Sequence, residues 1–359
     1  MRAALFLRPN APLEIEEVEL LAPGPQDVLV RVTATALCQT DVSVRDGKYD
    51  YGRPMIMGHE ACGVVEAIGA EVSHVKVGER VISTTAPTCG VCATCARGLS
   101  GCLKALDVRT TKRARRADGS MAAALYGLGS FADKMVVDQA SVVAVDSRAP
   151  DSHLALIGCG VTTGLGAVLN RLSLSAGSSM AVIGCGGVGL AAIQGARMCG
   201  ATTIVGIDPR AARREDAMAL GATAVIDPDS EDVVARVREL TEGLGVDACI
   251  DGVGSPTTTT QAYDAVRRSG SVIIVGLPAQ GTRLEFDAWQ FFLSEKRISS
   301  SLFGSAVNRR DLPLYARFAD EGKVDLGGLV SKLIKLEDVN AGLDALAAGE
   351  VVRVVVVQD

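Results

Sequence analysis

The stretch AVIGCGGVGLAA, residues 181–192, constrains the fold of this chain more than any other feature. It places Gly184, Gly186 and Gly189 in a G-x-G-x-x-G spacing between an apolar strand and a helix. Asp208 ends the next apolar run, nineteen residues after Gly189. A strand, a glycine turn, a helix and a following acidic residue are together typical of a dinucleotide-binding βαβ unit.

Each part of this pattern has a physical role in holding a dinucleotide. Gly184 allows the tight turn, Gly186 lets the backbone approach a pyrophosphate, and Gly189 lets the helix pack closely on the strand. The free N–H groups of the helix N-terminus then face the phosphates. Asp208 would accept hydrogen bonds from ribose hydroxyls and repel a 2′-phosphate, which favours NAD over NADP. The alternative is a glycine-rich turn that only packs tightly.

Strand-like and helix-like runs alternate around this unit, from residue 158 to residue 302. Six apolar strands with helices between them predict an α/β domain with a doubly wound parallel sheet. Residues 1–157 carry short β-prone runs broken by Gly, Pro and Asp, which predicts an irregular β-rich domain. Residues 303–359 contain two helical patterns and a final apolar strand, and we expect them to fold back onto the first domain.

Composition limits the classes of partner. The 359 residues carry a formal net charge of −6, which argues against a general affinity for nucleic acid or for an anionic membrane. The first apolar run ends at Arg8 and Pro9, too early for a signal peptide or a membrane span. We therefore expect a cytoplasmic protein whose ten cysteines are thiols or metal ligands rather than disulfides.

Residues 89–102, CGVCATCARGLSGC, form a cysteine lobe with the spacing C-x2-C-x2-C-x6-C. Its cysteines are Cys89, Cys92, Cys95 and Cys102. Four thiolates fit a tetrahedral zinc site that leaves no position for water, and such a site is structural. An iron–sulfur cluster or free thiols are the alternatives. Zinc is favoured because nothing else in the sequence indicates electron transfer.

A basic run, RTTKRARRADG, follows the cysteine lobe at residues 109–119. It contains five basic residues in what we expect to be a loop. A solvated loop is one interpretation. An anion-binding or oligomer-contacting patch is the other.

Seven motifs occur in one order along the chain: CQTD, GHE, the cysteine lobe, GCGVTTG, GCGGVG, the acidic end of the second strand and a late VVRVVV. In this order they resemble a zinc-dependent alcohol dehydrogenase of the medium-chain dehydrogenase/reductase superfamily, and the resemblance spans essentially the whole chain. It implies a GroES-like catalytic domain, a Rossmann domain for NAD and two zinc ions per subunit. It also implies a homodimer or homotetramer.

The resemblance implies a catalytic zinc held by Cys38, His59 and Cys159, with a fourth position for water or the substrate oxygen. Asp41 matches the carboxylate that orients the histidine ligand. Glu60 matches an acidic residue behind the metal, for which a structural ion pair is the alternative. Between the third and fourth cysteines of the lobe, the family usually has seven residues, whereas this chain has six. The loop must therefore close more tightly.

The implied activity is reversible hydride transfer between a primary or secondary alcohol and NAD. Thr40 matches the hydroxyl that takes the alcohol proton. The residues that match the substrate pocket are Tyr49, Thr85, Leu125 and Tyr126. Thr85 is smaller than the aromatic residue often found there, which suggests room for a bulky or aromatic alcohol. Trp289 is expected in the core or at a subunit interface rather than against substrate.

The resemblance also assigns cofactor contacts beyond the three glycines and Asp208. They are Thr163, Gly187, Val188, Arg213, Leu277 and Arg353. Thr163 would lie near the nicotinamide, Arg213 near the adenosine ribose and Arg353 near the pyrophosphate. For the two arginines, a solvated surface charge is the alternative.

Other functions stay open as alternatives. Within the family, the chain could be a thiol-dependent formaldehyde dehydrogenase. Outside enzymes, it could be a non-catalytic dinucleotide-binding protein. A polyol dehydrogenase is disfavoured because that branch commonly carries a glutamate where Cys159 stands, and a zinc-free quinone reductase is disfavoured by the three expected zinc ligands.

Overall fold

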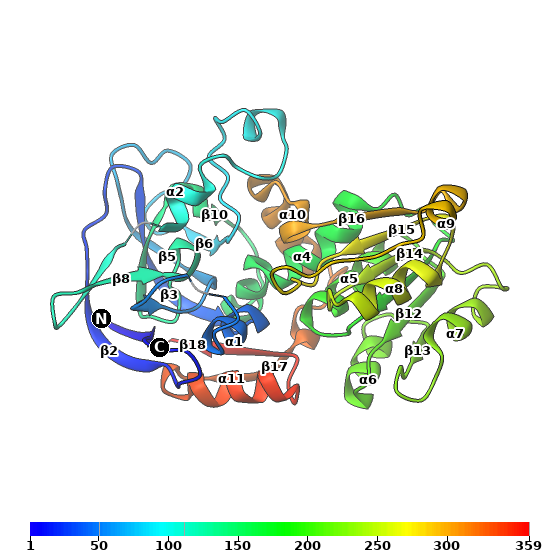
Figure 1. Cartoon of the computed structure of the whole chain (residues 1–359). Coiled ribbons are helices and arrows are strands. Elements are labelled where there is room, and N and C mark those ends of the chain that lie inside the picture. Colours follow the sequence, from blue (N-terminus) through cyan, green and yellow to red (C-terminus); the bar gives the residue numbers. More distant parts are fainter. Residues whose placement is uncertain (50, 111, 359) are drawn as a thin grey trace. The chain divides into compact units, whose positions relative to one another are not determined.

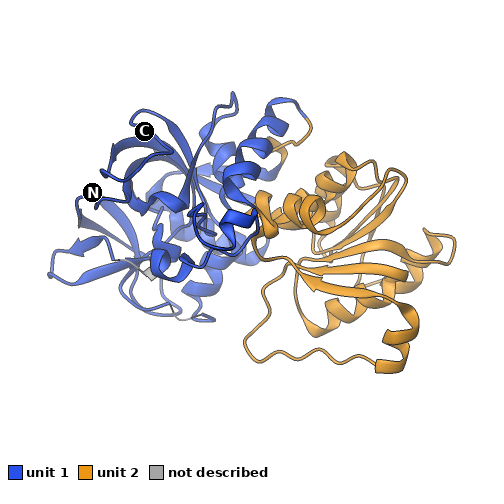
Figure 2. Ribbon diagram, turned by 90° about the horizontal axis from the view of Figure 1, so that it is seen from above, with its two compact units in different colours: residues 1–159, 307–322, 329–359 blue, residues 160–306, 323–328 orange. Residues whose placement is uncertain are grey.

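The computed structural model describes residues 1–49, 51–110 and 112–358, which form two compact units (Figures 1 and 2). Unit 1 comprises Met1–Cys159, Val307–Gly322 and Leu329–Asp359. Unit 2 comprises Gly160–Ala306 and Lys323–Gly328. The chain thus changes unit after residues 159 and 306, where the sequence placed boundaries after 157 and 302, and a short segment at 323–328 returns to unit 2.

Unit 1 is built mainly from β-strands. Five strands form a closed barrel: β1 (Arg2–Phe6), β2 (Glu14–Leu20), β7 (Ala114–Arg116), β8 (Met121–Ala124) and β4 (Met55–Ile56). A seven-stranded sheet contains β3 (Asp27–Ala36), β5 (Glu60–Ile68), β6 (Arg80–Ser83), β9 (Lys134–Asp138), β10 (Val142–Ala144), β17 (Val330–Ile334) and β18 (Arg353–Val357). In this sheet β18 pairs antiparallel with β3, so the C-terminal strand belongs to unit 1.

Among its described residues, unit 1 also contains five α-helices. They are α1 (Gln39–Arg45), α2 (Ala105–Thr110), α3 (Asp151–Leu154), α10 (Asn308–Asp320) and α11 (Val339–Ala348). A core that includes Phe6, Leu37, Phe131 and Val354 lies beneath α1 and α11. Because β3 leads directly into α1 across this core, the junction between them is held in place by packing on the residues around it.

Unit 2 contains a six-stranded parallel sheet. Its strands are β11 (Ser179–Ile183), β12 (Thr203–Ile207), β13 (Ala224–Ile226), β14 (Val246–Asp251), β15 (Val266–Ile274) and β16 (Arg297–Ser300). They lie in the order β13, β12, β11, β14, β15, β16. The strand order reverses between β11 and β14, and ligands of such sheets bind at the carboxyl ends of the strands beside that point. The predicted α/β fold with a Rossmann sheet is confirmed.

One helix precedes these strands and five connect them among the described residues. They are α4 (Gly160–Gly166), α5 (Gly187–Met198), α6 (Ala211–Ala219), α7 (Val233–Glu239), α8 (Pro256–Ala265) and α9 (Ala288–Ser294). Ser255 caps the N-terminus of α8, where its hydroxyl accepts the N–H of Thr258 at 3.1 Å, and Pro256 is the first helical residue. The helix ends at Ala265 and β15 follows at once, although the residues up to Gly270 read as a continuation of the helix.

Among the described residues, no single helix is both long and apolar enough to cross a membrane, although one bent pair, Asp151–Gly158 with Gly160–Arg171, passes by length and composition alone.

Candidate functional site

Three residues that are far apart in the sequence, Cys38, His59 and Cys159, come together within unit 1. Cys38 lies between β3 and α1, His59 immediately precedes β5, and Cys159 follows a short turn of 3₁₀ helix, Ala155–Gly158. These three residues and Glu60 each offer one ligand atom, and the four atoms all lie within 4.8 Å of one another. Cys38 and His59 are buried, and Cys159 is half-buried. The fold therefore assembles the set that the resemblance implied.

Asp41, in the first turn of α1, fixes the orientation of this set. Its Oδ1 lies 3.2 Å from His59 Nδ1 and accepts the backbone N–H of Gly58 at 3.2 Å. Its Oδ2 accepts the backbone N–H of Cys38 at 3.0 Å. A fully buried carboxylate with three partners holds the ring firmly and leaves Nε2 as the nitrogen available to the cluster.

The residues of the cluster fit a metal ion. His59 Nε2 is buried and has no hydrogen-bond partner among the described residues, although an unpaired buried nitrogen is costly. One imidazole and two thiolates are ligands that zinc prefers, and three protein ligands are typical of a catalytic zinc with an open position. A metal ion bound by this set would compensate the unpaired nitrogen.

The ionisation of the two sulfurs is linked. A hydrogen bond with Cys159, helped by His59, holds the pKa of Cys38 well below its ordinary value. The same hydrogen bond, together with burial, raises the pKa of Cys159 well above its ordinary value. Burial works to lower the pKa of His59, but the Asp41 carboxylate and the Cys38 sulfur outweigh it, so that pKa is raised. The cluster therefore stabilises a thiolate, the form in which cysteine binds metals.

Glu60 and Arg353 form a buried ion pair beside the cluster. The Arg353 guanidinium donates to Glu60 Oε2, and both side chains are almost fully buried. Glu60 Oε1 lies 4.0 Å from His59 Nε2. Burial raises the pKa of Glu60 to about 8, against the attraction of Arg353. Arg353 is therefore not the solvated surface charge that the sequence left open, and its contact with a pyrophosphate stays a prediction.

The four lobe cysteines also converge. Cys89 Sγ lies 4.0 Å from Cys95 Sγ, and Cys92 Sγ lies 4.0 Å from Cys102 Sγ. All four sulfurs lie within 4.8 Å of one another. These distances are about twice a disulfide bond length, and they are close to the edge of a tetrahedron with zinc–sulfur bonds of about 2.3 Å. The lobe fits a four-thiolate zinc site, and the shortened spacing does not keep Cys102 out of it.

Two of the predicted substrate-pocket residues belong to an aromatic group beside His59. The Tyr126 ring stands edge-on to the His59 ring, with centroids 5.5 Å apart. Tyr51 contacts Tyr126 at a centroid distance of 5.6 Å, and Tyr49 lies 6.4 Å from Tyr51. Thr40, expected to take a proton, is half-buried in the first turn of α1.

The other two predicted pocket residues have different surroundings. Thr85 is buried, two residues after the end of β6. Leu125 is completely buried in the core with Leu37 and Phe131, and its place in the pocket stays a prediction.

The glycine turn in unit 2 has the predicted strand–turn–helix form, since β11 ends at Ile183 and α5 begins at Gly187. A Cβ at Gly189 would lie 1.9 Å from the Gly184 carbonyl oxygen, so a side chain there would push the helix away from the turn. A Cβ at Gly186 would meet no atom within 4 Å, so its backbone borders open space. Gly187 and Val188, in the first turn of α5, are half-buried. Open space above the free N–H groups of a helix N-terminus suits a phosphate.

Asp208 follows β12 and is tied to this turn. Its Oδ2 accepts the backbone N–H of Cys185, and its Oδ1 accepts that of Arg210, each at 2.9 Å. The carboxylate is 7% exposed. An acidic group thus lies at the end of the second strand of the βαβ unit, where dinucleotide-binding folds place the residue that contacts the adenosine ribose.

The remaining predicted cofactor residues of unit 2 lie on three different elements. Thr163 is buried on α4. Arg213, on α6, is 6% exposed and pairs with Asp216 at 3.2 Å, so it is not a solvated surface charge. Leu277 follows β15 and is 55% exposed. Their contacts with a cofactor stay predictions.

Comparisons with known proteins agree on a family. Residues 24–147 match the alcohol dehydrogenase GroES-like domain, and residues 187–321 match the zinc-binding dehydrogenase family. The chain is 34% identical to the NDMA-dependent alcohol dehydrogenase of Amycolatopsis methanolica, over 99% of this chain and 98% of that protein. It is 33% identical to the S-(hydroxymethyl)glutathione dehydrogenase of Paracoccus denitrificans, over 99% of each. The solved benzyl alcohol dehydrogenase of Acinetobacter calcoaceticus has a TM-score of 0.93 and 31% identity, over 100% of this chain and 99% of that one.

This chain belongs to the zinc-type alcohol dehydrogenases of the medium-chain dehydrogenase/reductase superfamily. The resemblance stated from its motifs is confirmed. The β-rich unit 1 of this alcohol dehydrogenase is the GroES-like domain, and unit 2 is the Rossmann domain.

Part of the basic run is strand β7, which pairs with β2, where a loop was expected. A contact of the run with an anion or with another subunit stays a prediction. Arg113 pairs with Asp27, Arg115 with Glu19 at 3.3 Å, and Arg116 with Glu16 at 2.8 Å. Asp118, within the run, pairs with Arg116 at 2.8 Å, and the other acidic partners lie about a hundred positions earlier. Thr111, within the run, lies outside the described residues.

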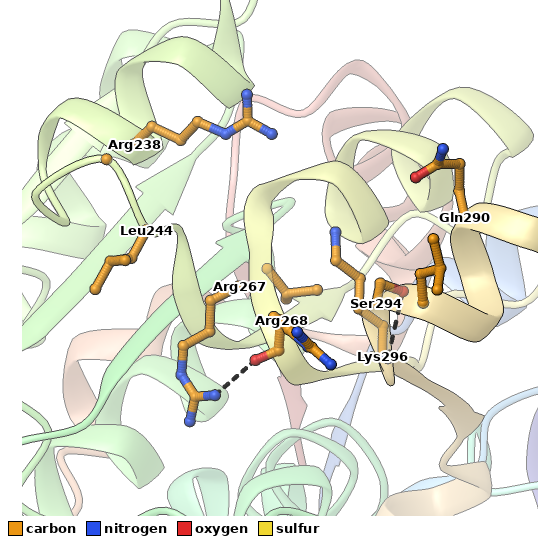
Figure 3. Close-up of a pocket in the computed structure, with 10 residues that line it drawn as sticks. Arg238, Leu244, Arg267, Arg268, Gln290, Ser294 and Lys296 are labelled. Carbon is orange, nitrogen blue, oxygen red and sulfur yellow. Dashed lines mark hydrogen bonds between the residues drawn. The ribbon is translucent and has the colours of Figure 1, made fainter.

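A separate hollow of about 360 Å³ opens in unit 2 of the alcohol dehydrogenase (Figure 3). It is lined at the start of β15 and β16, and therefore lies at the edge of the parallel sheet opposite the glycine turn. Arg267 pairs with Asp247 and Arg268 with Glu295, whereas Arg238 and Lys296 donate to backbone carbonyls.

Sequence reasoning missed two residues at the aromatic group. Tyr51 lies two positions after Tyr49, and its hydroxyl is 3.4 Å from that of Tyr126. The Arg109 guanidinium lies over the Tyr126 ring, 5.3 Å from its centroid. Tyr49 and Tyr51 are close together in the sequence. Because Tyr126 is distant from them, the sequence did not indicate that the three tyrosines form one group. Arg109 was noticed only as one charge of the basic run.

Proposed function

We propose that this chain is an NAD-dependent zinc alcohol dehydrogenase that interconverts alcohols with aldehydes or ketones. The observation that carries the proposal is His59 Nε2, which is buried beside two cysteine sulfurs and has no partner among the described residues while Asp41 holds the other ring nitrogen. An unpaired buried nitrogen lowers the folding stability, and such a cost is typical of residues at a functional site.

The chain's own residues have distinct tasks in this reaction. Cys38, His59 and Cys159 would hold a zinc ion, which would supply a Lewis acid that lowers the pKa of an alcohol hydroxyl. Asp41 keeps the His59 ring fixed, so the ligand geometry costs no reorganisation during the reaction. The hydroxyl of Thr40 would take the alcohol proton and pass it toward the nicotinamide ribose. NAD, held by the residues of the glycine turn and Asp208, would supply the hydride acceptor for the carbinol C–H bond.

NAD rather than NADP is the proposed cofactor. Asp208 lies at the end of β12 with a nearly buried carboxylate. A 2′-phosphate placed near it would meet like charge in a region of low solvent access, whereas ribose hydroxyls would donate to it. The exposed backbone at Gly186 and the N-terminus of α5 would bind the pyrophosphate.

Aromatic or otherwise bulky alcohols are the proposed substrates. Tyr49, Tyr51 and Tyr126 provide aromatic surface next to His59, and Thr85 is small. Aromatic side chains stack favourably on aromatic ligands in offset or edge-on arrangements. One structural relative is named a benzyl alcohol dehydrogenase, which agrees with this choice.

A thiol-dependent formaldehyde dehydrogenase is the second candidate, because one relative is named an S-(hydroxymethyl)glutathione dehydrogenase. In that case the substrate would be the adduct of formaldehyde with a low-molecular-weight thiol, a primary alcohol that the same residues could oxidise. The aromatic surface favours the first candidate.

One experiment separates these functions. The purified protein is assayed by NADH absorbance with ethanol, cyclohexanol and benzyl alcohol, and with formaldehyde in the presence and absence of glutathione, each with NAD and with NADP. The proposal expects the highest kcat/KM for benzyl alcohol with NAD. Turnover of formaldehyde only in the presence of glutathione would favour the second candidate, and no turnover of any compound would contradict both.

We also propose that the enzyme is a homodimer formed through unit 2. β16 is an edge strand of the sheet, and the neighbouring α9 exposes Trp289 to 67% and Phe292 to 76%. Trp289 is therefore not in the core, which corrects one of its two predicted locations. A two-fold axis beside β16 would pair the strand with its own copy and cover these rings.

A further inference from the structure

Tyr126 has an uncommon backbone conformation. Its φ and ψ are 54° and 24°, in the left-handed region, and the following residue, Gly127, has a φ of 74°. A bulky residue rarely adopts this region, and it does so only where the surroundings hold it there. Something close to residues 126 and 127 must therefore stabilise this turn.

The end of helix α2 supplies that support. A Cβ at Gly127 would lie 2.4 Å from the Val108 carbonyl oxygen and 3.1 Å from the Arg109 Cα, so helix and turn are in direct contact. The Arg109 guanidinium lies over the Tyr126 ring, 5.3 Å from its centroid, a distance suited to a cation–π interaction. Arg109 thus holds one face of the tyrosine ring.

Arg109 is itself anchored on a second wall of the site. Its Nε and Nη2 donate to the Thr85 carbonyl oxygen at 3.0 Å and 2.5 Å. The planar guanidinium can make these two bonds and cover an aromatic ring at the same time, which a lysine cannot do. The segment after β6 and the turn at Tyr126 are therefore linked through one side chain.

Tyr126, held in this way, contacts the ring of His59. Its ring stands edge-on to the imidazole at 5.5 Å with an interplanar angle of 83°. Its hydroxyl lies 3.4 Å from that of Tyr51. The tyrosine is thus held between Arg109, Tyr51 and His59, and a shift of its ring would change both the support of His59 and the shape of the aromatic surface.

We infer that Arg109 is a positioning residue that sets the place of Tyr126 and thereby the preference of the enzyme for bulky or aromatic alcohols. This inference rests on the proposed function for its substrate class. It assigns Arg109 no contact with substrate, because the guanidinium is engaged by the Thr85 carbonyl and the Tyr126 ring.

The kinetic test uses Arg109→Met, with Lys112→Met as the control because Lys112 is exposed and close by in the sequence. For Arg109→Met, kcat/KM with benzyl alcohol should fall about tenfold, mainly through KM, as expected for losing a partly desolvated cation–π contact. With ethanol it should change less than about twofold, because a small alcohol does not need the aromatic surface. The control should keep both values. An equal fall for both alcohols would overturn the inference, since it would indicate general damage.

A double-mutant cycle tests whether Arg109 acts through Tyr126. Tyr126→Leu alone should also weaken selection for benzyl alcohol, and adding Arg109→Met to it should cause little further loss. If the two losses multiply, Arg109 acts independently of Tyr126 and the inference is wrong. Should Arg109→Met fail to fold, Arg109→Lys replaces it, with a smaller loss in the same direction expected because lysine lacks the planar fork.

A second readout does not depend on alcohol turnover. The rate at which a colorimetric chelator removes zinc is measured for the wild-type holoenzyme, Arg109→Met and Lys112→Met. Arg109→Met should release one of the two zinc ions several-fold faster, because the edge-on support of His59 is loosened. Unchanged release would count against the inference even if no alcohol were a substrate, whereas inactivity of the wild type with all alcohols would count against the proposed function alone.

Discussion

Asp41 is the single residue on which the geometry of the candidate catalytic site depends most. It binds the His59 ring, the Gly58 backbone and the Cys38 backbone with two oxygens. It therefore fixes two of the three expected ligands at once, although it does not itself belong to the ligand cluster. Carboxylates in this position raise the basicity of a histidine ligand and keep it in one orientation.

Replacing Asp41 by alanine should weaken zinc binding at this site by about 10–100-fold and reduce kcat by a similar factor. Zinc affinity is measured by competition with a chelator, and kcat by NADH formation. Asp146→Ala, at an exposed position, is the matched control. Full zinc affinity in the Asp41 variant would show that the carboxylate does not orient His59.

Asp208 offers a second prediction at the level of one residue. Asp208→Ser removes the negative charge near the expected ribose position, so the ratio of kcat/KM for NAD to that for NADP should fall by about tenfold or more. The exposed Asp229→Ser is the control and should leave the ratio unchanged. An Asp208→Ser variant that prefers NAD as strongly as the wild type would show that Asp208 does not set the choice of cofactor.

At this scale, functional residues that are close together in the sequence were predicted better than residues that meet only in the fold. The cysteine lobe and the glycine turn each lie within a few residues, so their spacing carries the chemistry. Cys38, His59 and Cys159 could be joined only through a family resemblance, because nothing local relates them. The pairing of Glu60 with Arg353 spans 293 positions, and the burial of Leu125 depends on core packing, so neither could be predicted from residue type.

At the level of elements, strands buried on both faces were easier to predict than strands at the barrel surface. Strands β11, β12 and β13 of unit 2 are nearly continuous apolar runs, which is the pattern expected where helices cover both faces of a sheet. Strand β7 instead carries arginines and was predicted as loop, because its pairing with β2 and with the glutamates of that strand is not visible in the local sequence. The end of α8 was also missed, since the sequence has no glycine or proline before β15 begins at Val266.

The arginines around β7 give a test of this pairing. Arg113 and Asp27 have side chains only 15% and 9% exposed, whereas Arg115 and Glu19 are 49% and 66% exposed. Arg113→Met should therefore lower the free energy of unfolding by about 1–3 kcal/mol, because it leaves Asp27 without its cation. Arg115→Met should change it little, as is usual for exposed pairs. Urea titration of both variants measures the difference, and equal stabilities would contradict the role given to Arg113.

At the level of the whole molecule, the two units have separate tasks. Unit 1 contains both cysteine-containing clusters, and unit 2 contains the glycine turn and Asp208. The last strand, β18, returns to the sheet of unit 1 and brings Arg353 to Glu60. This arrangement explains why residues from the beginning, middle and end of the sequence are all needed around His59.

The exposed rings of α9 give a prediction about assembly. Phe292→Asp places a charge in the middle of the proposed subunit contact, so the molar mass in solution should fall from that of an oligomer toward 37.2 kDa. The exposed Leu244→Asp, at the hollow in unit 2, is the control. Light scattering measures both. A wild-type protein that is monomeric at micromolar concentration would contradict the proposed dimer.

The central claim is that Cys38, His59 and Cys159 hold a zinc ion that the reaction requires. Metal analysis of the purified wild type and of Cys159→Ala, combined with alcohol-dependent NADH formation, tests it most directly. We expect one zinc ion for each of the two ligand clusters in the wild type, and in Cys159→Ala the loss of one ion and of nearly all activity, with the lobe zinc retained. A Cys159→Ala enzyme that turns over alcohol at the wild-type rate, or a fully active wild type without zinc, would contradict the claim.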